Sequence, residues 1–161
     1  MGKVATLKEL LRIRKDLKNA HKKVVFTNGC FDILHRGHVE YLANAKALGD
    51  VLIVGVNSDA SVKRIKGDGR PIVDVEDRTH VLAALASVDY VCVFDEDTPY
   101  NIISQLVPDI LVKGADWPLE KVVGRDVVEA AGGSVKTIEF LPHRSTSRII
   151  EKISRAAALQ Q

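Results

Sequence analysis

The chain has 161 residues, of which 46% are apolar, and its 23 basic residues nearly balance its 21 acidic ones. This length and composition predict one domain, residues 1–161, with a real core and no nucleic-acid partner. No apolar run approaches the roughly 18 residues of a membrane span, so we expect no membrane partner. Two cysteines without disulfide-scaffold spacing, and no apolar leader segment, predict a soluble cytoplasmic protein.

The first predicted element is an amphipathic helix within residues 1–20. Thr6 to Glu9 has the form of a capping box, and one stripe of the following turns is apolar, with Leu7, Leu10, Leu11 and Leu17. The helix is also basic, as membrane-surface and partner-binding helices are. Because the stripe is short, we expect the helix to pack on the domain.

The stretch from Thr27 to His38 joins a predicted strand to a predicted helix. An apolar run ends at Phe26 just before it, and residues 39–48 after it have helical spacing. Parallel sheets bind ligands at the carboxyl ends of their strands, where the next helix presents unpaired N–H groups to an anion. Glycines allow close backbone approach here, and His35 and His38 can face one side of the first helical turn. The stretch predicts an anion site with two imidazoles.

Strands and helices alternate along the remaining chain. A polar loop is expected over residues 63–71. The predicted strands are residues 24–26, 51–56, 90–94, 110–112 and 134–140, and the predicted helices are 39–48, 75–87, 98–106, 122–131 and one that starts near Ser145. This alternation predicts an α/β fold: a Rossmann-like, doubly wound, parallel five-stranded sheet with helices on both faces.

Polar and basic side chains follow the ends of the predicted strands. Asn57 and Asp59 suit a ribose or a base edge, and Lys113 and the hydroxyls of residues 145–147 suit phosphate oxygens. The first turn lacks the dinucleotide motif G-x-G-x-x-G, and the chain lacks the P-loop motif. Hydride transfer and P-loop chemistry are therefore disfavoured.

The motif His35-Arg36-Gly37-His38 resembles that of the H-x-G-H nucleotidyltransferases. Over nearly the whole chain, further segments are similar to the adenylyltransferases that make ADP-heptose from D-glycero-β-D-manno-heptose 1-phosphate. These segments are Thr27–His38, Val56–Asp59, Lys66-Gly67, Arg78, Val88–Val91, Asp97–Pro99, Leu111–Trp117 and Ser145–Ser147. The resemblance implies transfer of AMP from ATP to the sugar 1-phosphate, for lipopolysaccharide core or related glycan synthesis, by a stand-alone enzyme without a sugar kinase domain. It also implies Mg²⁺, held mainly by phosphates and water, and a homo-oligomer, most simply a dimer.

The same resemblance implies roles for individual residues. The catalytic residues are His35 and His38, which stabilise the pentacoordinate phosphorus, with Lys46 assisting at the phosphates. The nucleotide-binding residues are Asn28, Gly29, Cys30, Phe31, Gly37, Asn57, Asp59, Lys113, Gly114, Ser145, Thr146 and Ser147. On the acceptor side, Lys66 and Arg78 bind the sugar phosphate. Asp32 orients neighbouring groups or the metal, since the attacking phosphate oxygen is already ionised and needs no base.

Most of these roles have a structural alternative. The histidines could cap the helix, or bind zinc with Cys30. Lys66 could belong to a solvated charge run, and Arg78 could pair with Asp74. Three other residues could have a purely structural role: Asp59 at the end of a strand, Ser145 as the cap of the last helix, and Trp117 as a packed aromatic side chain.

The last turn departs from the family pattern. His143 stands where small or acidic residues are expected, and Ser147 where Thr is usual. Hydroxyl chemistry is kept, and Arg144 could add a phosphate contact. Two other functions stay open: a cytidylyltransferase acting on glycerol 3-phosphate or a related alcohol phosphate, and a non-catalytic nucleotide-binding module that regulates a partner.

Overall fold

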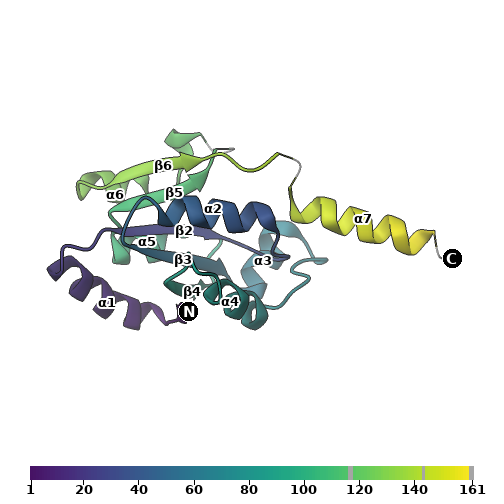
Figure 1. The fold of residues 1–161 in the computed structure, drawn as a ribbon, viewed down its shortest axis with the longest axis horizontal. Coiled ribbons are helices and arrows are strands. Elements are labelled where there is room, and N and C mark those ends of the chain that lie inside the picture. Colours follow the sequence, from purple (N-terminus) through teal and green to yellow (C-terminus); the bar gives the residue numbers. More distant parts are fainter. Residues whose placement is uncertain (116–117, 143, 160–161) are drawn as a thin grey trace.

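The fold is built on a parallel sheet with strand order β1-β4-β3-β2-β5-β6. The computed structural model describes residues 1–115, 118–142 and 144–159. The strands are β1 (Lys3–Val4), β2 (Val24–Gly29), β3 (Val51–Asn57), β4 (Tyr90–Phe94), β5 (Ile110–Gly114) and β6 (Ser134–Ile138), and every pair in the sheet is parallel. The predicted Rossmann-like α/β fold is confirmed, but the sheet has six strands, because two residues at the N-terminus pair with the edge of β4 (Figure 1).

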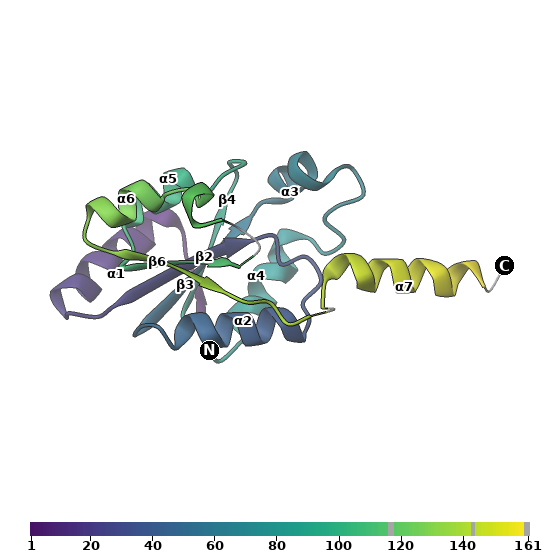
Figure 2. The same ribbon diagram turned by 90° about the horizontal axis from the view of Figure 1, so that it is seen from above.

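Helices cover both faces of the sheet. They are α1 (Leu7–Asn19), α2 (Arg36–Lys46), α3 (Asp59–Lys66), α4 (Val75–Ala83), α5 (Tyr100–Leu106), α6 (Arg125–Ala130) and α7 (Thr146–Ala158), with a short 3₁₀ turn η1 (Leu119–Lys121). Figure 2 shows α2 on one side of the strands and α5 and α6 on the other. No helix in the described ranges is long and apolar enough to cross a bilayer.

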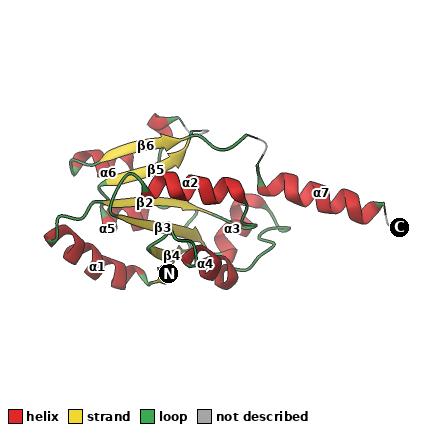
Figure 3. Ribbon diagram, viewed as in Figure 1, coloured by secondary structure: helices red, strands yellow, loops and turns green. Residues whose placement is uncertain are grey.

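Two hydrophobic clusters fill the space between the sheet and its helices. On one face, α2 and α4 supply Leu42 and Leu82. On the other face, α1 and α5 supply Leu10 and Ile103. Successive residues of β2 and β3 alternate between the two clusters, as the pleat of a strand requires. The two-sided burial predicted for residues 51–56 is confirmed, and the strands form one layer (Figure 3).

The helix boundaries differ from the prediction in one important place. Residues 63–66 were expected in a loop, but they form the second half of α3. Ser58 caps this helix by accepting from the backbone N–H of Ser61, and Gly67, with φ of 96°, ends it. A basic last turn also favours the helix, because cations interact well with its carboxyl end. In α1, the predicted capping box between Thr6 and Glu9 is confirmed.

The last helix extends away from the rest of the molecule. Figures 1 and 2 show α7 projecting away from the sheet, with its first turn near the N-terminal end of α2. None of its residues is buried. The N-terminus of α7 therefore lies near the carboxyl ends of the strands, and the helix contributes little to the core.

Candidate active site

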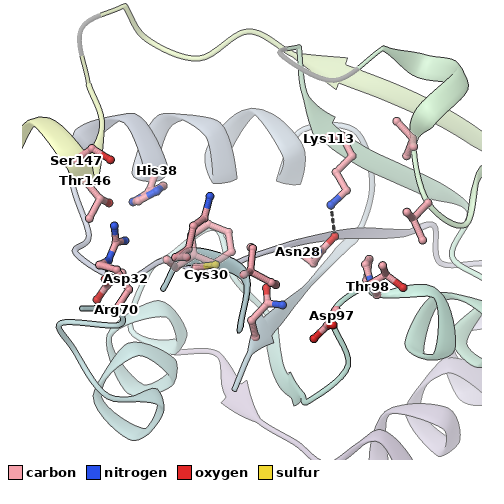
Figure 4. Close-up of a pocket in the computed structure, with 18 residues that line it drawn as sticks. Asn28, Cys30, Asp32, His38, Arg70, Asp97, Thr98, Lys113, Thr146 and Ser147 are labelled. Atoms are coloured by element: carbon pink, nitrogen blue, oxygen red, sulfur yellow. Dashed lines mark hydrogen bonds and ion pairs between the residues drawn. The ribbon is translucent and has the colours of Figure 1, made fainter. Parts of the chain in front are cut away.

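A cavity of about 440 Å³ opens at the carboxyl ends of the strands. The turn after β2, the first turn of α2, the end of β3, the loop after α3, the loop after β4, β5 and the start of α7 all line it (Figure 4). Its polar lining residues are Asn28, Cys30, Asp32, His38, Asn57, Lys66, Arg70, Asp97, Thr98, Lys113, Thr146 and Ser147. Segments far apart in the sequence converge here, as the parallel topology predicts.

The two histidines of the H-x-G-H motif stack on each other. Their ring centroids are 3.9 Å apart, with planes inclined by 19°, and the Phe31 ring meets that of His38 edge-on at 5.3 Å. A Cβ atom on Gly37 would come within 2.9 Å of the His35 ring, so this packing requires glycine. His35 precedes α2 with an extended backbone, and its side chain makes no cap hydrogen bond. The capping alternative is therefore not what its side chain does.

Both imidazoles are neutral at pH 7. Burial lowers the pKa of His38 to about 4, and the neighbouring His35 adds to this effect. Burial, with the charge of Arg144, also lowers the pKa of His35. Within the described part of the chain, the Nδ1 atoms of both rings are buried without a hydrogen-bond partner. A buried polar atom without a partner is costly, so the arrangement favours a ligand that supplies one.

Asp32 organises the loop after α3. Its side chain is fully buried, and its Oδ1 accepts from the backbone N–H groups of Ile72 and Val73, each at 2.8 Å. Its Oδ2 accepts from the Nε of Arg70. Burial alone would raise the pKa of Asp32, but these three hydrogen bonds outweigh it and lower the pKa. The geometry agrees with an orienting role rather than with a base.

Arg78 lies beneath the site rather than in it. Its guanidinium is completely buried and donates to the carbonyls of Val73, Cys30 and Asn57 and to the carboxylate of Asp59. Neither Arg78 nor Asp59 lines the cavity, so the geometry gives no support to the predicted roles of Arg78 at the sugar phosphate and of Asp59 at the nucleotide. The alternative pairing of Arg78 with Asp74 is wrong, since Asp74 caps α4.

Lys46 lies near the amino ends of the strands, opposite the cavity. It ends α2 and donates to the Asp89 carboxylate at 2.5 Å and to the Asp50 carbonyl, and both partners precede strands. Lys46 follows His38 by eight positions in the sequence, a rise of roughly 12 Å along a helix, which carries the lysine away from the carboxyl ends of the strands. Lys46 does not line the cavity, so the geometry gives no support to its predicted role at the nucleotide phosphates.

Some of the remaining predicted residues hydrogen-bond to other side chains, and others line a cavity. Lys113 donates to the Oδ1 of Asn28, and the buried Asn57 donates to the Ser61 hydroxyl at 3.0 Å. Gly114 lines a smaller hollow of about 150 Å³ that shares Asn28, Gly29, Cys30, Phe31, His38 and Lys113 with the main cavity. Exposed Lys66 also lines the main cavity. Asp116, Trp117 and His143 lie outside the described residues.

The start of α7 brings hydroxyls to the cavity. Thr146 and Ser147 line it, and the Thr146 hydroxyl donates to the carbonyl of Ile33 at 3.4 Å. The hydroxyl of Ser145 instead accepts from the backbone N–H of Arg148 at 3.3 Å. The structural alternative for Ser145, a helix cap, is thus what the geometry shows.

A zinc site finds no support in the described residues. They contain no group of three or more His, Cys, Asp or Glu side chains placed to hold a metal ion. Burial raises the pKa of the Cys30 thiol above its usual value, which disfavours the thiolate that zinc requires.

A family model described as cytidylyltransferase-like matches residues 26–152. The chain belongs to the cytidylyltransferase-like family. The expected relationship to the nucleotidyltransferases is confirmed, and the chain is an enzyme of that class. Among the positions that carry the family's motif, the structure brings together the turn after β2, the paired imidazoles and the start of α7.

Two curated relatives are more than 50% identical to this chain over the matched residues. The bifunctional protein HldE of Citrifermentans bemidjiense is 64% identical over 132 residues, which cover 82% of this chain and 27% of that protein. The protein of the same name from Geobacter metallireducens is 55% identical over 155 residues, which cover 96% of this chain and 32% of that protein. The chain thus spans about a third of the length of these relatives.

Two solved structures share the fold of this family member. The lipopolysaccharide core biosynthesis protein from Thermoplasma volcanium has a TM-score of 0.62 and 29% identity, covering 76% of this chain and 99% of that one. A pantoate-beta-alanine ligase from Francisella tularensis has a TM-score of 0.63 at 16% identity, covering 91% of this chain and 69% of that one. The second likeness concerns the fold alone.

Proposed function

We propose that this enzyme transfers AMP from ATP to D-glycero-β-D-manno-heptose 1-phosphate, forming ADP-heptose and pyrophosphate for surface-glycan synthesis. The observation that carries the chemistry is the pair of neutral, stacked imidazoles beside a cavity that also receives the start of α7. The similarity to proteins named HldE supports the heptose substrate.

The reaction requires alignment of two anions and no covalent enzyme intermediate. An oxygen of the sugar phosphate attacks the α-phosphorus of ATP, and the bond from that phosphorus to the bridging oxygen breaks. The electron pair stays on that oxygen and leaves with pyrophosphate. His38 and His35 supply N–H donors to the charge that develops on the phosphoryl oxygens, without the reorganisation that water would need.

The other lining residues divide between the two substrates. The hydroxyls of Thr146 and Ser147, with the helix start behind them, suit the β- and γ-phosphates. Asn28, Lys113 and Asn57 suit the nucleoside, and Lys66 suits the acceptor phosphate.

We expect Mg²⁺ to enter with ATP. Three donors already occupy most of the acceptor sites of the Asp32 carboxylate, and the described residues contain no cluster of acids. Phosphate oxygens and water would therefore hold the metal, as Mg²⁺ prefers. When bound, the ion neutralises part of the charge on the phosphates.

Pyrophosphate release from a panel of substrates tests the proposal. The purified protein is incubated with ATP, CTP or GTP in turn, together with heptose 1-phosphate or glycerol 3-phosphate. Turnover is expected with ATP and heptose 1-phosphate. Turnover only with CTP and glycerol 3-phosphate would identify a cytidylyltransferase instead. Nucleotide binding without turnover in any mixture would favour the regulatory module.

A further inference from the structure

Arg70 is a cation of the cavity to which the family motifs assign no role. Its side chain is 17% exposed and lines the cavity. Figure 4 shows Arg70 and Asp32 on the side of the pocket where His38, Thr146 and Ser147 lie, whereas Asn28 and Lys113 lie on the opposite side. The guanidinium therefore belongs to the end of the cavity where α7 begins.

Two consecutive residues hold this arrangement together. The carboxylate of Asp32 accepts from the Nε of Arg70, and the carbonyl of Ile33 accepts from the hydroxyl of Thr146 at 3.4 Å. The Asp32-Ile33 segment thus ties the loop after α3 to the first turn of α7. Because the Ile72 and Val73 amides also donate to Asp32, the position of Arg70 is fixed by a buried anchor.

The donors gathered here suit a multiply charged anion. The Nε of Arg70 is used by Asp32, which leaves the two Nη groups, a planar fork that matches two phosphate oxygens. The 13-residue helix α7 adds the partial positive charge of its N-terminus and the hydroxyls of Thr146 and Ser147. The buried Nδ1 atoms of His35 and His38 have no partner among the described residues.

We infer that Arg70, positioned by Asp32, binds the β- and γ-phosphates of ATP and then the pyrophosphate that leaves. This inference rests on the proposed nucleotidyl transfer. When the bond between the α-phosphorus and the bridging oxygen breaks, the electron pair stays on the pyrophosphate, whose charge rises. A guanidinium already in place stabilises that charge, and Asp32 acts through the orientation of Arg70.

The reverse reaction tests this most directly, because pyrophosphate is then a substrate. With ADP-heptose and pyrophosphate, Arg70→Ala is expected to raise the KM for pyrophosphate by about tenfold or more, since it removes charged hydrogen bonds. The KM for ADP-heptose should change less than twofold. Arg70→Lys should have a KM for pyrophosphate between those of the wild type and Arg70→Ala, because lysine keeps the positive charge but lacks the two Nη donors. Arg125→Ala is the matched control: it removes another carboxylate-paired arginine, on α6, and should change neither constant.

A double mutant separates positioning by Asp32 from a direct contact. The Oδ1 of an asparagine can still accept from Ile72 and Val73, but its amide cannot accept from Arg70. Asp32→Asn should therefore raise the KM for pyrophosphate, and Asp32→Asn combined with Arg70→Ala should be no worse than Arg70→Ala alone. Multiplicative effects would overturn the positioning role. Circular dichroism melts show which variants are folded. If Asp32→Asn does not fold, Arg70→Lys still tests the inference.

The outcomes distinguish this inference from the proposed function. If Arg70→Ala raises only the KM for the sugar phosphate in the forward reaction, Arg70 serves the acceptor and the inference is wrong. If the wild-type protein catalyses neither direction, the proposed function fails. Calorimetric titration with pyrophosphate then decides, because equal affinity of wild type and Arg70→Ala, or no binding to the wild type, would overturn the inference.

Discussion

At the scale of single residues, His38 combines burial with a role at a charged centre. Its ring stacks on His35 and meets Phe31, and burial keeps it neutral at pH 7. A neutral imidazole donates one N–H without bringing a cation that would attract phosphate in the ground state. It is therefore suited to stabilise charge that grows during the reaction.

Replacement of His38 tests that role. His38→Ala should lower kcat by roughly 10²-fold or more while it weakens ATP binding much less, because the lost contact strengthens in the transition state. Steady-state kinetics and calorimetric titration with ATP measure the two effects. His80→Ala, which removes an exposed histidine of α4, is the control. An unchanged kcat in His38→Ala would remove His38 from the mechanism.

The lowered pKa of His38 also predicts how stability depends on pH. An unfolded histidine titrates near 6.5, whereas folded His38 titrates at about 4, so between these values the unfolded state binds more protons. Stability should therefore fall as the pH falls from about 6.5 to 4, by at most about 3 kcal/mol. His35 acts in the same direction. The lowered pKa of Asp32 acts mainly below this window, because its contribution is lost as the pH falls through its folded pKa.

Urea unfolding between pH 7 and pH 4.5 measures this dependence in wild type and His38→Ala. The free energy of unfolding of the variant should fall less steeply over the window. Parallel curves would show that other groups carry the acid sensitivity.

Local motifs predicted the histidines well, but they could not predict the partners of charged residues. His35 and His38 are neighbours on one turn, so their spacing already determines that they meet. Arg78 instead finds carbonyls and a carboxylate on segments that only the folded sheet brings together. The sequence does not single out Arg70, because Arg70 follows other basic residues in a run that resembles a solvated loop. Only the folded structure pairs Arg70 with Asp32.

At the scale of elements, Arg78 joins the turn after β2, the end of β3 and the start of α4. Its guanidinium is completely buried, so its removal takes a donor from three carbonyls and from the Oδ1 of Asp59, whose Oδ2 still accepts from the backbone N–H of Val75. Arg78→Ala should destabilise the protein by at least about 1–3 kcal/mol, the cost of leaving a buried carbonyl without its donor. Urea unfolding measures the loss.

Two comparisons sharpen the prediction for Arg78. Arg125→Ala removes an exposed ion pair on α6 and should cost well under about 1 kcal/mol. If Arg78→Ala keeps wild-type stability and raises the KM for the sugar phosphate, Arg78 returns to the substrate site.

The elements missed from the sequence are those with weak periodic signals. Two residues of β1 are too few to show alternation, and their pairing depends on the exposed edge of β4. The second half of α3 is a run of exposed residues, so its helix rests on the Ser58 cap and not on an apolar stripe. The strands at residues 51–56 and 90–94 were predictable because each is a continuous apolar run of strand length.

At the scale of the whole molecule, the core and the site depend on different parts of the chain. The sheet and the helices α1, α2, α4, α5 and α6 supply the hydrophobic clusters, and α7 supplies none of their buried residues. Only the first turn of α7 lines the cavity. A helix of this length is marginally stable alone in water, so the Ser145 cap and the contact of Thr146 with Ile33 are what fix its start.

Truncation after Lys152 tests this division of labour. It removes the exposed Ile153 and the turns beyond it, but keeps the cap and both hydroxyls of the first turn. We expect the melting temperature to stay within about 2 °C of the wild type, which corresponds to no more than about 0.5–1 kcal/mol for a chain of this size, and the affinity for ATP to change less than twofold. Calorimetric melts and titrations measure both, and light scattering gives the mass. A much larger drop in melting temperature together with a fall in mass would instead show that Ile153 and the turns beyond it pack against a second copy of the chain, as the expected homo-oligomer would allow.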